Sequence, residues 1–195
     1  MKKNLILTTA ARLFAERGFS NTPTSLLAKE ANVAEGTIFR HFKTKDEIFL
    51  TLINNVRDQL ITDIEKYLEV RAPDTSVEKV ISIIKSFYVF VLKNRMEFGL
   101  IFRDAPTRYG ERNDTVLMAI KEIYDYLGGY IVIAIREGQA NGTIRQDLHT
   151  EDTTKMLIGT MVGLVRAIHF QFLQPSDDVL RHVVESYTYL LTPKQ

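Results

Sequence analysis

Residues 22–46 read Thr-Pro-Thr-Ser-Leu-Leu-Ala-Lys-Glu-Ala-Asn-Val-Ala-Glu-Gly-Thr-Ile-Phe-Arg-His-Phe-Lys-Thr-Lys-Asp, and this stretch largely determines the fold. Its pattern predicts two short helices joined by a tight turn, the first ending near Ala31 and the second covering about Glu35 to Phe42. Thr22 is expected to cap the first helix, with Pro23 at its first helical position. The spacing therefore predicts a compact helical corner.

Small and apolar residues define the packing of this corner. Ala28 is placed at the close contact between the two helices, and Asn32 tolerates the positive φ that the turn requires. The residues expected to face inward are Leu27, Ala31, Val33 and Ile38. Those expected to face outward are Lys29, Glu30, Glu35 and Thr37. This arrangement is the packing that a helix-turn-helix requires.

The exposed face of the second helix carries hydrogen-bond donors and cations. Thr37, Arg40, His41 and Lys43 lie on or near that face. The major groove of DNA admits a short helix that is held by its apolar side and presents such groups on the other. The pattern therefore predicts a DNA-binding protein.

The rest of the chain is dominated by helical periodicity, with no sustained alternation typical of a strand. Before the helix-turn-helix, another helix is expected to begin after Asn4 and to end at Gly18. After the helix-turn-helix, a capping box over residues 44–47 is expected to begin a long helix. The buried stripe of that long helix is predicted to be Phe49, Leu52, Ile53, Val56, Leu60, Ile64 and Tyr67. The predicted fold class is all-α, with three small helices followed by a larger bundle and about nine helices in total.

The boundaries of the later helices follow from caps, prolines and glycines. Pro73 ends the long helix, Thr75 to Glu78 form a second capping box, and a short helix ends before Pro106. After a polar stretch over 107–113, a helix is expected to reach Asn141, with Gly142 after it and a kink at Gly128-Gly129. Thr150 is expected to cap a helix that reaches about Leu173, and the last helix is predicted over Asp177 to Leu191.

Composition excludes several classes of protein. The chain of 195 residues contains no cysteine, which excludes disulfides and thiolate metal sites. The first residues imitate a secretory signal, but Arg12, Glu16 and Arg17 interrupt the apolar stretch too early. Apolar runs such as 130–135 are too short to span a bilayer, so we expect a cytoplasmic protein.

The net charge of +1 conceals an uneven distribution. The first 50 residues hold 8 Lys or Arg against 5 Asp or Glu, whereas the remainder holds 17 against 19. The positive excess is thus confined to the N-terminal quarter but is small. Tight binding to DNA would therefore need two copies of the chain.

Residues 4–54 resemble the N-terminal domain of TetR-type transcriptional regulators. The positions that match the family pattern in order and spacing are Gly18-Phe19, Thr22, Leu27-Ala28, Ala31, Val33, Gly36-Thr37-Ile38, His41-Phe42 and Lys45. The departures are Pro23, Asn32, Ala34 and Phe39. Because Ala34 and Phe39 lack the hydroxyl groups usual at their positions, we expect fewer phosphate contacts than the family pattern implies.

The resemblance implies a helix-turn-helix DNA-binding domain over residues 1–46 and an effector-binding and dimerisation domain over 47–195. The implied DNA-binding residues are Thr22, Thr24, Glu35, Gly36, Thr37, Phe39, Arg40, His41, Lys43 and Lys45. The alternative for Arg40 or Lys45 alone is a solvated helix face. Phe39 either packs on the sugar-phosphate backbone or holds the following helix.

The resemblance also implies a pocket for a small lipophilic effector and a homodimer. The expected effector-binding residues are Phe87, Phe90, Phe98, Phe102, Met118, Tyr124 and Met161. The expected dimer-interface residues are Gly159, Gly163, Ile168, Phe172, Val184 and Tyr187, with helix contacts inside one subunit as the alternative for the glycines. Arg95, Arg103 and Arg108 either meet an anionic head group, such as that of an acyl-CoA, or form surface ion pairs. The usual function of such a protein is repression, relieved when the effector tilts the long helix after residue 44.

The alternatives to a DNA-binding protein are an all-α enzyme and a helical adaptor that binds protein. No catalytic motif or glycine-rich phosphate loop is present, so we expect no catalytic residue, no cofactor and no enzyme activity. His169 and His182 are the only pair of histidines placed to approach each other, and a metal site there is not expected. A helical adaptor that binds protein through the N-terminal face remains the second alternative.

Overall fold

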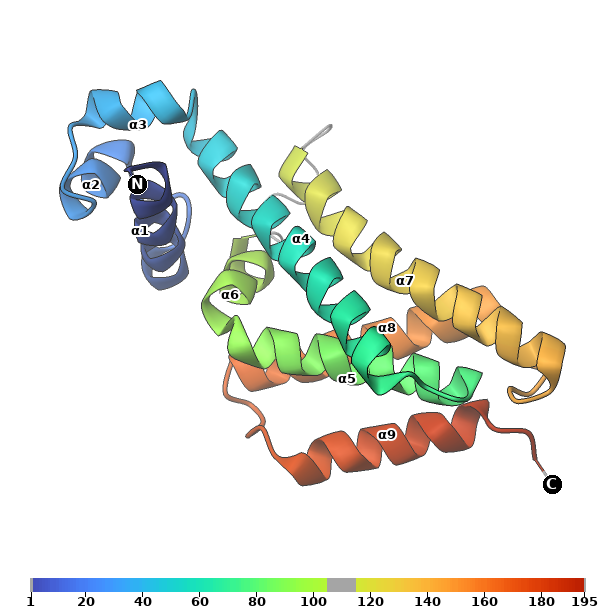
Figure 1. The fold of residues 1–195 in the computed structure, drawn as a ribbon. Coiled ribbons are helices and arrows are strands. Elements are labelled where there is room, and N and C mark those ends of the chain that lie inside the picture. Colours follow the sequence, from blue (N-terminus) through green and yellow to red (C-terminus); the bar gives the residue numbers. More distant parts are fainter. Residues whose placement is uncertain (1, 105–114, 195) are drawn as a thin grey trace. The chain divides into compact units, whose positions relative to one another are not determined.

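The computed structural model describes the backbone of residues 2–104 and 115–194, and the side chains of 2–101 and 115–194. These residues form nine helices and no strand, which confirms the all-α prediction (Figure 1). The helices are α1 Lys2–Arg17, α2 Thr24–Glu30, α3 Glu35–His41, α4 Lys45–Arg71, α5 Ser76–Lys93, α6 Arg95–Asp104, α7 Thr115–Asn141, α8 Thr150–His169 and α9 Asp177–Leu191. None of the described helices is long and apolar enough to cross a membrane.

The chain divides into two compact units. The first comprises residues up to 59 together with 94–122, and the second comprises 60–93 together with 123–195. Helices α4 and α7 each contribute to both units. The division at residue 46, which we expect on functional grounds, stays a prediction.

The core of the first unit forms where α1 packs against α2, α3 and α6. Phe14 of α1 and Phe49 of α4 are fully buried, and Phe19 from the turn after α1 packs against both. The three ring centroids lie 5.1–5.8 Å apart in tilted or edge-on geometry, which suits the quadrupoles of aromatic rings. This cluster joins the end of α1 to the beginning of α4.

Turns and caps in the first unit mostly follow the prediction. Gly18 and Asn32 both adopt positive φ, at 84° and 49°, as expected for the ends of α1 and α2. The Thr44 hydroxyl accepts a hydrogen bond from the Glu47 amide at 3.0 Å, which confirms the capping box before α4. The Glu47 carboxylate accepts in return from the amide of Lys43 at 2.6 Å.

Two predicted helix starts in this unit are wrong. Helix α1 begins at Lys2 rather than after Asn4, so Asn4 lies inside the helix and is not its N-cap. Helix α2 begins at Thr24, and Pro23 occupies the N-cap position with extended backbone angles. Thr22 does not cap α2, because its hydroxyl is directed back toward the end of α1.

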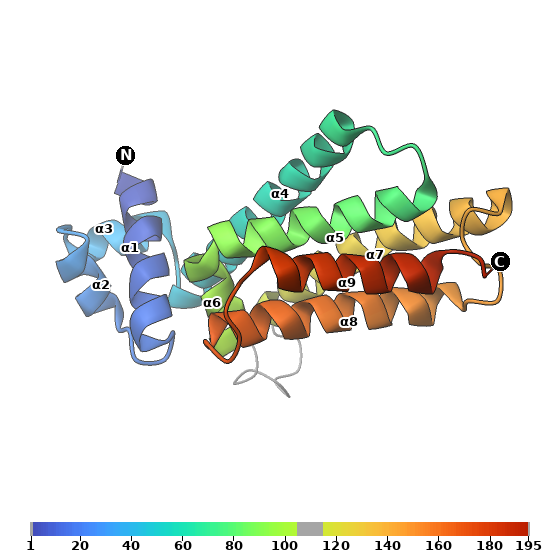
Figure 2. The ribbon, with the colours of Figure 1, turned by 90° about the horizontal axis from the view of Figure 1, so that it is seen from below.

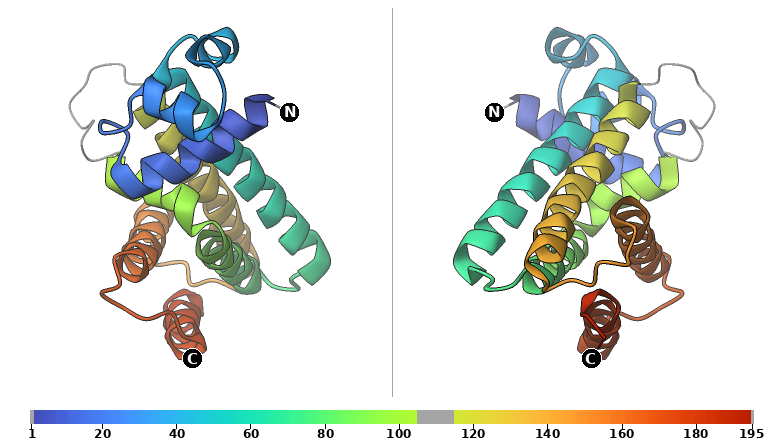
Figure 3. Two further views of the ribbon diagram at one scale, coloured as in Figure 1. Left: turned by 90° about the vertical axis from the view of Figure 1, so that its left-hand side faces the viewer. Right: turned by 90° about the vertical axis from the view of Figure 1, so that its right-hand side faces the viewer.

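In the second unit, α5 packs against α8 and α9 (Figures 2 and 3). The predicted capping box before α5 is confirmed, since the Thr75 hydroxyl accepts from the Glu78 amide at 3.2 Å. The buried Tyr187 of α9 donates its phenol to the Leu157 carbonyl of α8 at 3.2 Å. Ser176 caps α9 by accepting from the Val179 amide, and α9 spans the predicted residues.

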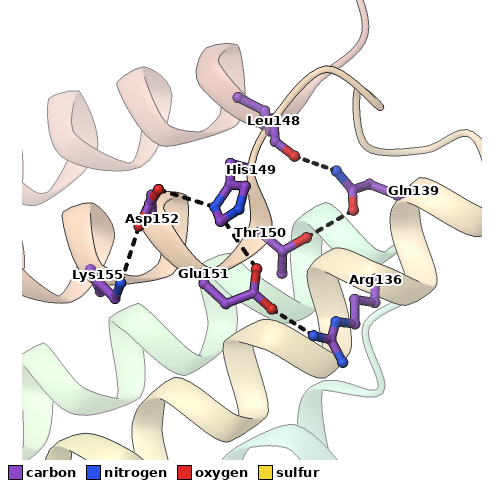
Figure 4. Close-up of polar contacts among 8 residues, drawn as sticks. All are labelled: Arg136, Gln139, Leu148, His149, Thr150, Glu151, Asp152 and Lys155. Carbon is purple, nitrogen blue, oxygen red and sulfur yellow. Dashed lines mark hydrogen bonds and ion pairs between the residues drawn. The ribbon is translucent and has the colours of Figure 1, made fainter.

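Two predictions around α8 are wrong. Thr150 is the first helical residue rather than the cap, and its hydroxyl donates to the Gln139 side chain at 3.0 Å (Figure 4). Helix α8 ends at His169 rather than near Leu173, because Gln171 adopts a positive φ of 61°.

Helix α7 continues through its paired glycines to Asn141, as its predicted end requires. Gly138 near that end is needed for packing, since a Cβ there would lie 2.6 Å from Ile144. The turn after α7 can therefore fold back against the helix.

The C-terminal half of α4 is attached to α7 inside the second unit. The phenols of Tyr126 and Tyr130 lie 2.8 Å apart, and both donate to one oxygen of Glu65, at 3.0 and 2.9 Å. Burial, followed by the hydrogen bonds to Tyr130 and Glu65, raises the pKa of Tyr126. The three side chains connect α4 and α7 through polar contacts.

Candidate DNA-binding site

The corner between α2 and α3 has the packing predicted from the sequence. Leu27, Ala28, Ala31 and Ile38 are buried. The amide of Val33 donates to the Ala28 carbonyl at 3.0 Å, which closes the turn. Val33 itself is half-buried rather than fully inward. The corner therefore holds α3 firmly by its apolar side.

The outward face of α3 carries cations that no described residue neutralises. Arg40 and Lys43 are exposed, and neither forms an ion pair with any residue that the structure describes. Thr37 and His41 are half-buried beside them, and Gly36 leaves open space at the start of the helix. Phe39 is 48% exposed, so it does not belong to the core. This face offers donors and positive charge to an anionic partner.

One carboxylate lies among these groups. Glu35 is exposed in the first turn of α3, and one of its oxygens accepts a hydrogen bond from the Thr24 hydroxyl at 2.7 Å. The bond connects the first turn of α2 to the first turn of α3. A negative charge at this point is favourable because helix N-termini carry partial positive charge. The side chains of Thr24 and Glu35 therefore belong to the same end of the corner.

Thr22 occupies a position that excludes the expected phosphate contact. Its side chain is fully buried, and its hydroxyl donates to the carbonyls of Gly18 and Leu13, at 2.8 and 3.4 Å. These bonds tie Thr22 to the last turns of α1 and to the glycine that follows it. The side chain stabilises the turn between α1 and α2 and has no surface to offer a ligand.

Lys45 is likewise engaged within the protein. Its ammonium donates to the Phe19 carbonyl at 2.9 Å and lies 4.3 Å from the centroid of the Phe19 ring. A cation above an aromatic face is attracted by the ring quadrupole. Lys45 thus holds the first turn of α4 against the end of α1, and it is half-buried rather than presented to solvent.

The structure adds a cation that the sequence pattern did not single out. The ammonium of Lys3 lies 5.5 Å from the ring centroid of Phe42, the residue that ends α3. Lys2 and Lys3 are both exposed in the first turn of α1. The charge count pointed to this region, but only the fold places Lys3 beside α3.

The residues expected to bind an effector are divided between the two units. Phe98 is buried in the first unit, and Met118 of the same unit is 59% exposed. Phe87 and Met161 line one apolar cavity of about 10 Å³ among α5, α7 and α8 of the second unit. The other residues of that cavity are Ile83, Ile84, Leu127, Ile131, Leu157 and Ile158.

The remaining expected effector residues lie elsewhere. Phe90 is buried but faces a separate groove, and Tyr124 is half-buried in the second unit. Burial raises the pKa of Tyr124, which the charge of Arg166 partly offsets. The side chains of Phe102 and Arg103, and the whole of Arg108, lie outside the described residues, whereas Arg95 is exposed.

The residues expected at a dimer interface differ in exposure. Gly159 and Gly163 lie on an exposed face of α8, and an added Cβ at either would meet nothing within 4 Å. Phe172 is 84% exposed, and Val184 is half-buried. Ile168 and Tyr187 are buried within the chain, so they support the subunit core rather than a surface.

Further apolar side chains lie exposed on and between α8 and α9, namely Met156, Phe170 and Tyr189. His169 packs edge-on against the ring of Phe170. The described residues contain no group of three or more histidines and carboxylates that could hold a metal ion.

Comparison with known proteins identifies the N-terminal region. Residues 6–52 match the family model described as bacterial regulatory proteins, tetR family. The chain is 28% identical over 162 residues to the fatty acid metabolism regulator protein of Bacillus subtilis (strain 168), and the match covers 80% of this chain and 77% of that protein.

Two solved structures share the fold along nearly the whole chain. The transcriptional regulator FadR from Bacillus subtilis, in complex with stearoyl-CoA, aligns with a TM-score of 0.78 and 23% identity over 96% of this chain and 98% of that one. AibR, in complex with isovaleryl coenzyme A and operator DNA, aligns with a TM-score of 0.73 and 18% identity over the full length of both chains. The helix-turn-helix and the match over 6–52 agree, so the N-terminal region of the chain belongs to the tetR family of bacterial regulatory proteins, and the two solved structures show that the whole chain shares their fold.

Proposed function

We propose that this protein is a dimeric, DNA-binding transcriptional regulator that represses its target until a small lipophilic effector releases it from operator DNA. The observation that carries the proposal is the face of α3, where Arg40 and Lys43 are exposed and unpaired on a firmly packed corner. A helix so presented suits the major groove, and cations at its end suit the phosphates that border the groove.

The proposed DNA surface differs from the expected one in three residues. It comprises Thr24, Glu35, Gly36, Thr37, Phe39, Arg40, His41 and Lys43, with Lys3 added at the end of α3. Thr22 is left out because it is buried, and Lys45 is assigned to holding α4 rather than a phosphate. Residues 1–46 thus act as the DNA-binding domain, and 47–195 as the effector-binding and dimerisation domain.

The proposed dimer forms through the exposed faces of α8 and α9 around a two-fold axis. Gly159 and Gly163 allow close approach of a second helix, and Met156, Phe170 and Phe172 supply apolar surface. Such a dimer sets two α3 helices about one DNA turn apart, about 34–36 Å. Two copies also compensate for the small positive excess of one DNA-binding domain.

The proposed effector class is an acyl-CoA. Support comes from the two similar regulators whose structures contain stearoyl-CoA and isovaleryl coenzyme A. The apolar cavity lined by Phe87 and Met161 is far too small for an acyl chain, so a bound chain must separate α5, α7 and α8. An acyl chain would therefore bind only the conformation in which these helices are separated, and this preference would shift the protein toward that conformation.

The location follows from the function rather than from the composition. A bacterial regulator meets its operator in the cytoplasm, which is therefore the proposed compartment.

Selection of bound sequences from random double-stranded DNA tests the proposal. We expect enrichment of a two-fold symmetric site whose half-sites lie about one helical turn apart. Enrichment should disappear with an Arg40→Ala, Lys43→Ala double variant and persist with Arg136→Ala, which removes an already paired cation of α7. Absence of any enriched sequence with the unaltered protein would contradict the function.

A further inference from the structure

The second unit contains a groove between the C-terminal half of α4 and the facing side of α5. Two adjoining hollows of about 320 and 350 Å³ form it, and both are lined by Tyr67. The first hollow runs along both helices toward Lys93, and the second continues to Pro73, where the chain turns from α4 into α5. We call these two hollows the α4–α5 groove.

The groove follows one face of each helix. Its α4 wall uses positions 63, 66, 67 and 70, and its α5 wall uses positions 86, 89, 90 and 93. Spacings of three and four place such residues in one row on a helix surface. The first hollow is therefore an elongated channel bounded by two parallel rows of side chains.

The floor of the channel is apolar although it is open to solvent. The apolar residues that line it are Val70, which is 76% exposed, Val89, which is 39% exposed, and the buried Phe90. Tyr67 is half-buried and presents an aromatic ring to both hollows. Exposed apolar surface with a polar rim is a common feature of binding sites.

The rim carries lysines that lack partners. Lys66, Lys85 and Lys93 form no ion pair or hydrogen bond with any residue that the structure describes. Lys85 is half-buried and contributes to the second hollow, whereas Lys66 and Lys93 flank the first. A half-buried ammonium without an anionic partner is costly, because it has lost part of its hydration. This cost applies to Lys85, and the exposed Lys66 and Lys93 add two further unpaired cations, so the groove favours a ligand with more than one negative charge.

The acidic residues of the groove reduce this charge only in part. Asp63 lies in the first hollow, and Asp74 and Glu78 lie in the second. The Glu78 carboxylate is committed to α5, since it accepts from the amides of Asp74 and Thr75 at 3.0 and 3.4 Å. Arg71 adds a fourth cation above the Tyr67 ring, 5.8 Å from its centroid. Positive charge therefore remains in excess along the groove.

We propose that the α4–α5 groove binds the coenzyme A portion of an acyl-CoA. Lys66, Lys85 and Lys93 hold its phosphate groups, and the adenine ring lies on the apolar floor formed by Tyr67, Val70 and Val89. A free fatty acid has a single carboxylate and would use one cation, whereas coenzyme A carries a diphosphate and a separate ribose phosphate. The proposal rests on the acyl-CoA effector class proposed above. It places the anionic part of the acyl-CoA in the groove, outside the apolar cavity lined by Phe87 and Met161.

Calorimetric titration of the purified full-length protein tests this site with three probes: coenzyme A, 3′-dephospho-coenzyme A and pantetheine. We expect coenzyme A to bind, the dephosphorylated probe to bind about tenfold more weakly, and pantetheine not to bind. Equal binding of coenzyme A and pantetheine would overturn the proposal, because pantetheine has no phosphate.

The matching variant is Lys66→Gln, Lys85→Gln, Lys93→Gln, with Lys155→Gln as control. Lys155 of α8 is paired with Asp152 at 3.1 Å and lies outside the groove. We expect the triple variant to weaken coenzyme A binding at least about thirtyfold, from about threefold per lysine, and the control to leave it unchanged. Circular dichroism checks that the triple variant folds. If the triple variant does not fold, the single variant Lys66→Gln provides the test, with an expected loss of about threefold in coenzyme A affinity. Unchanged coenzyme A affinity in the folded triple variant would overturn the proposal. A groove that is covered by a second subunit and binds no coenzyme A would also overturn it.

Operator release separates this proposal from the proposed function. If acyl-CoA releases the unaltered protein and the triple variant from operator DNA at the same concentration, the groove assignment fails while the regulator stands. If no operator is found but coenzyme A binding depends on the three lysines, the groove assignment stands while the regulatory function fails.

Discussion

The face of α3 and the first turn of α8 carry similar residues in opposite electrostatic situations. In α8, Glu151 pairs with Arg136 at 2.5 Å, and Asp152 pairs with Lys155 and His149, each at 3.1 Å (Figure 4). Arg40 on α3 and Lys43 just after α3 form no ion pair with a carboxylate among the described residues. Charged residues are common in both places, so their number does not distinguish a binding surface from a solvated one. A binding surface is distinguished by charges that form no ion pair within the chain.

The same contrast applies to packing along α8. Its first turn is tied to α7 by Thr150, whose hydroxyl donates to the side-chain oxygen of Gln139 at 3.0 Å. Further along, Gly159 and Gly163 face open space. We therefore infer binding surfaces where charged groups are unpaired, or helix faces uncovered, within the described chain.

The largest effect is expected from blocking the bare face of α8. A Gly159→Arg, Gly163→Arg double variant should fold, because nothing in the chain lies near either position, but it should prevent close approach of a second subunit. Loss of the dimer removes the second DNA contact, and operator affinity should fall about 10²- to 10⁴-fold. Light scattering reports the mass, and a gel-shift titration reports the affinity. A variant that remains dimeric and binds the operator normally would place the interface elsewhere.

A large effect is also expected from the unpaired cations. Arg40→Ala with Lys43→Ala should weaken operator binding at least about a hundredfold at low salt. A dimer that loses four phosphate contacts should show a slope of log affinity against log salt that is smaller by roughly 3.6. The paired cation Arg136 is the control, and Arg136→Ala should alter neither quantity. Equal effects of both variants would remove the distinction between paired and unpaired charges.

A smaller effect separates two assignments of Lys45. If Lys45 holds α4 through Phe19, Lys45→Met should lower the free energy of unfolding by about 1–2 kcal/mol and leave the salt slope of DNA binding unchanged. If it contacts phosphate, the slope of the dimer should fall by roughly 1.8 instead. Lys43→Met is the matched variant at an exposed position and should reduce the slope without lowering stability.

The smallest effect concerns the paired charges of α8. Hydrogen bonding to its own backbone amide, followed by that to Arg136, lowers the pKa of Glu151 below its usual 4.5, and Lys155 lowers that of Asp152 below 3.8. Depressed folded-state pKa values mean that this stabilisation is present above the usual values and is lost as pH falls through the folded ones. Thermal unfolding between pH 6 and pH 3, about the range that spans both groups, should therefore decline less steeply in a Glu151→Gln, Asp152→Asn variant. Equal declines would mean that the solvated pairs contribute nothing measurable.

Helix caps, turn residues and helical periodicity were sufficient to predict most of the helices and part of the candidate DNA-binding site. The caps at Thr44 and Thr75, the positive φ at Gly18 and Asn32, and the limits of α9 depend on residues a few positions apart. Ala28 is expected at the close contact between the two helices and Ile38 is expected to face inward, and both are buried. The exposed positions of Arg40 and Lys43 follow from the same periodicity.

The sequence by itself thus determined that the chain is helical and where a helix-turn-helix lies, because capping and amphipathic periodicity are short-range effects. Only the tertiary structure decided which polar groups are used within the protein. Lys45 reaches a carbonyl 26 residues away, Tyr187 reaches one 30 residues away, and Thr22 is turned inward to close α1. A side chain at helical spacing can serve a ligand or a neighbouring helix, and the choice depends on distant residues that the fold brings into contact.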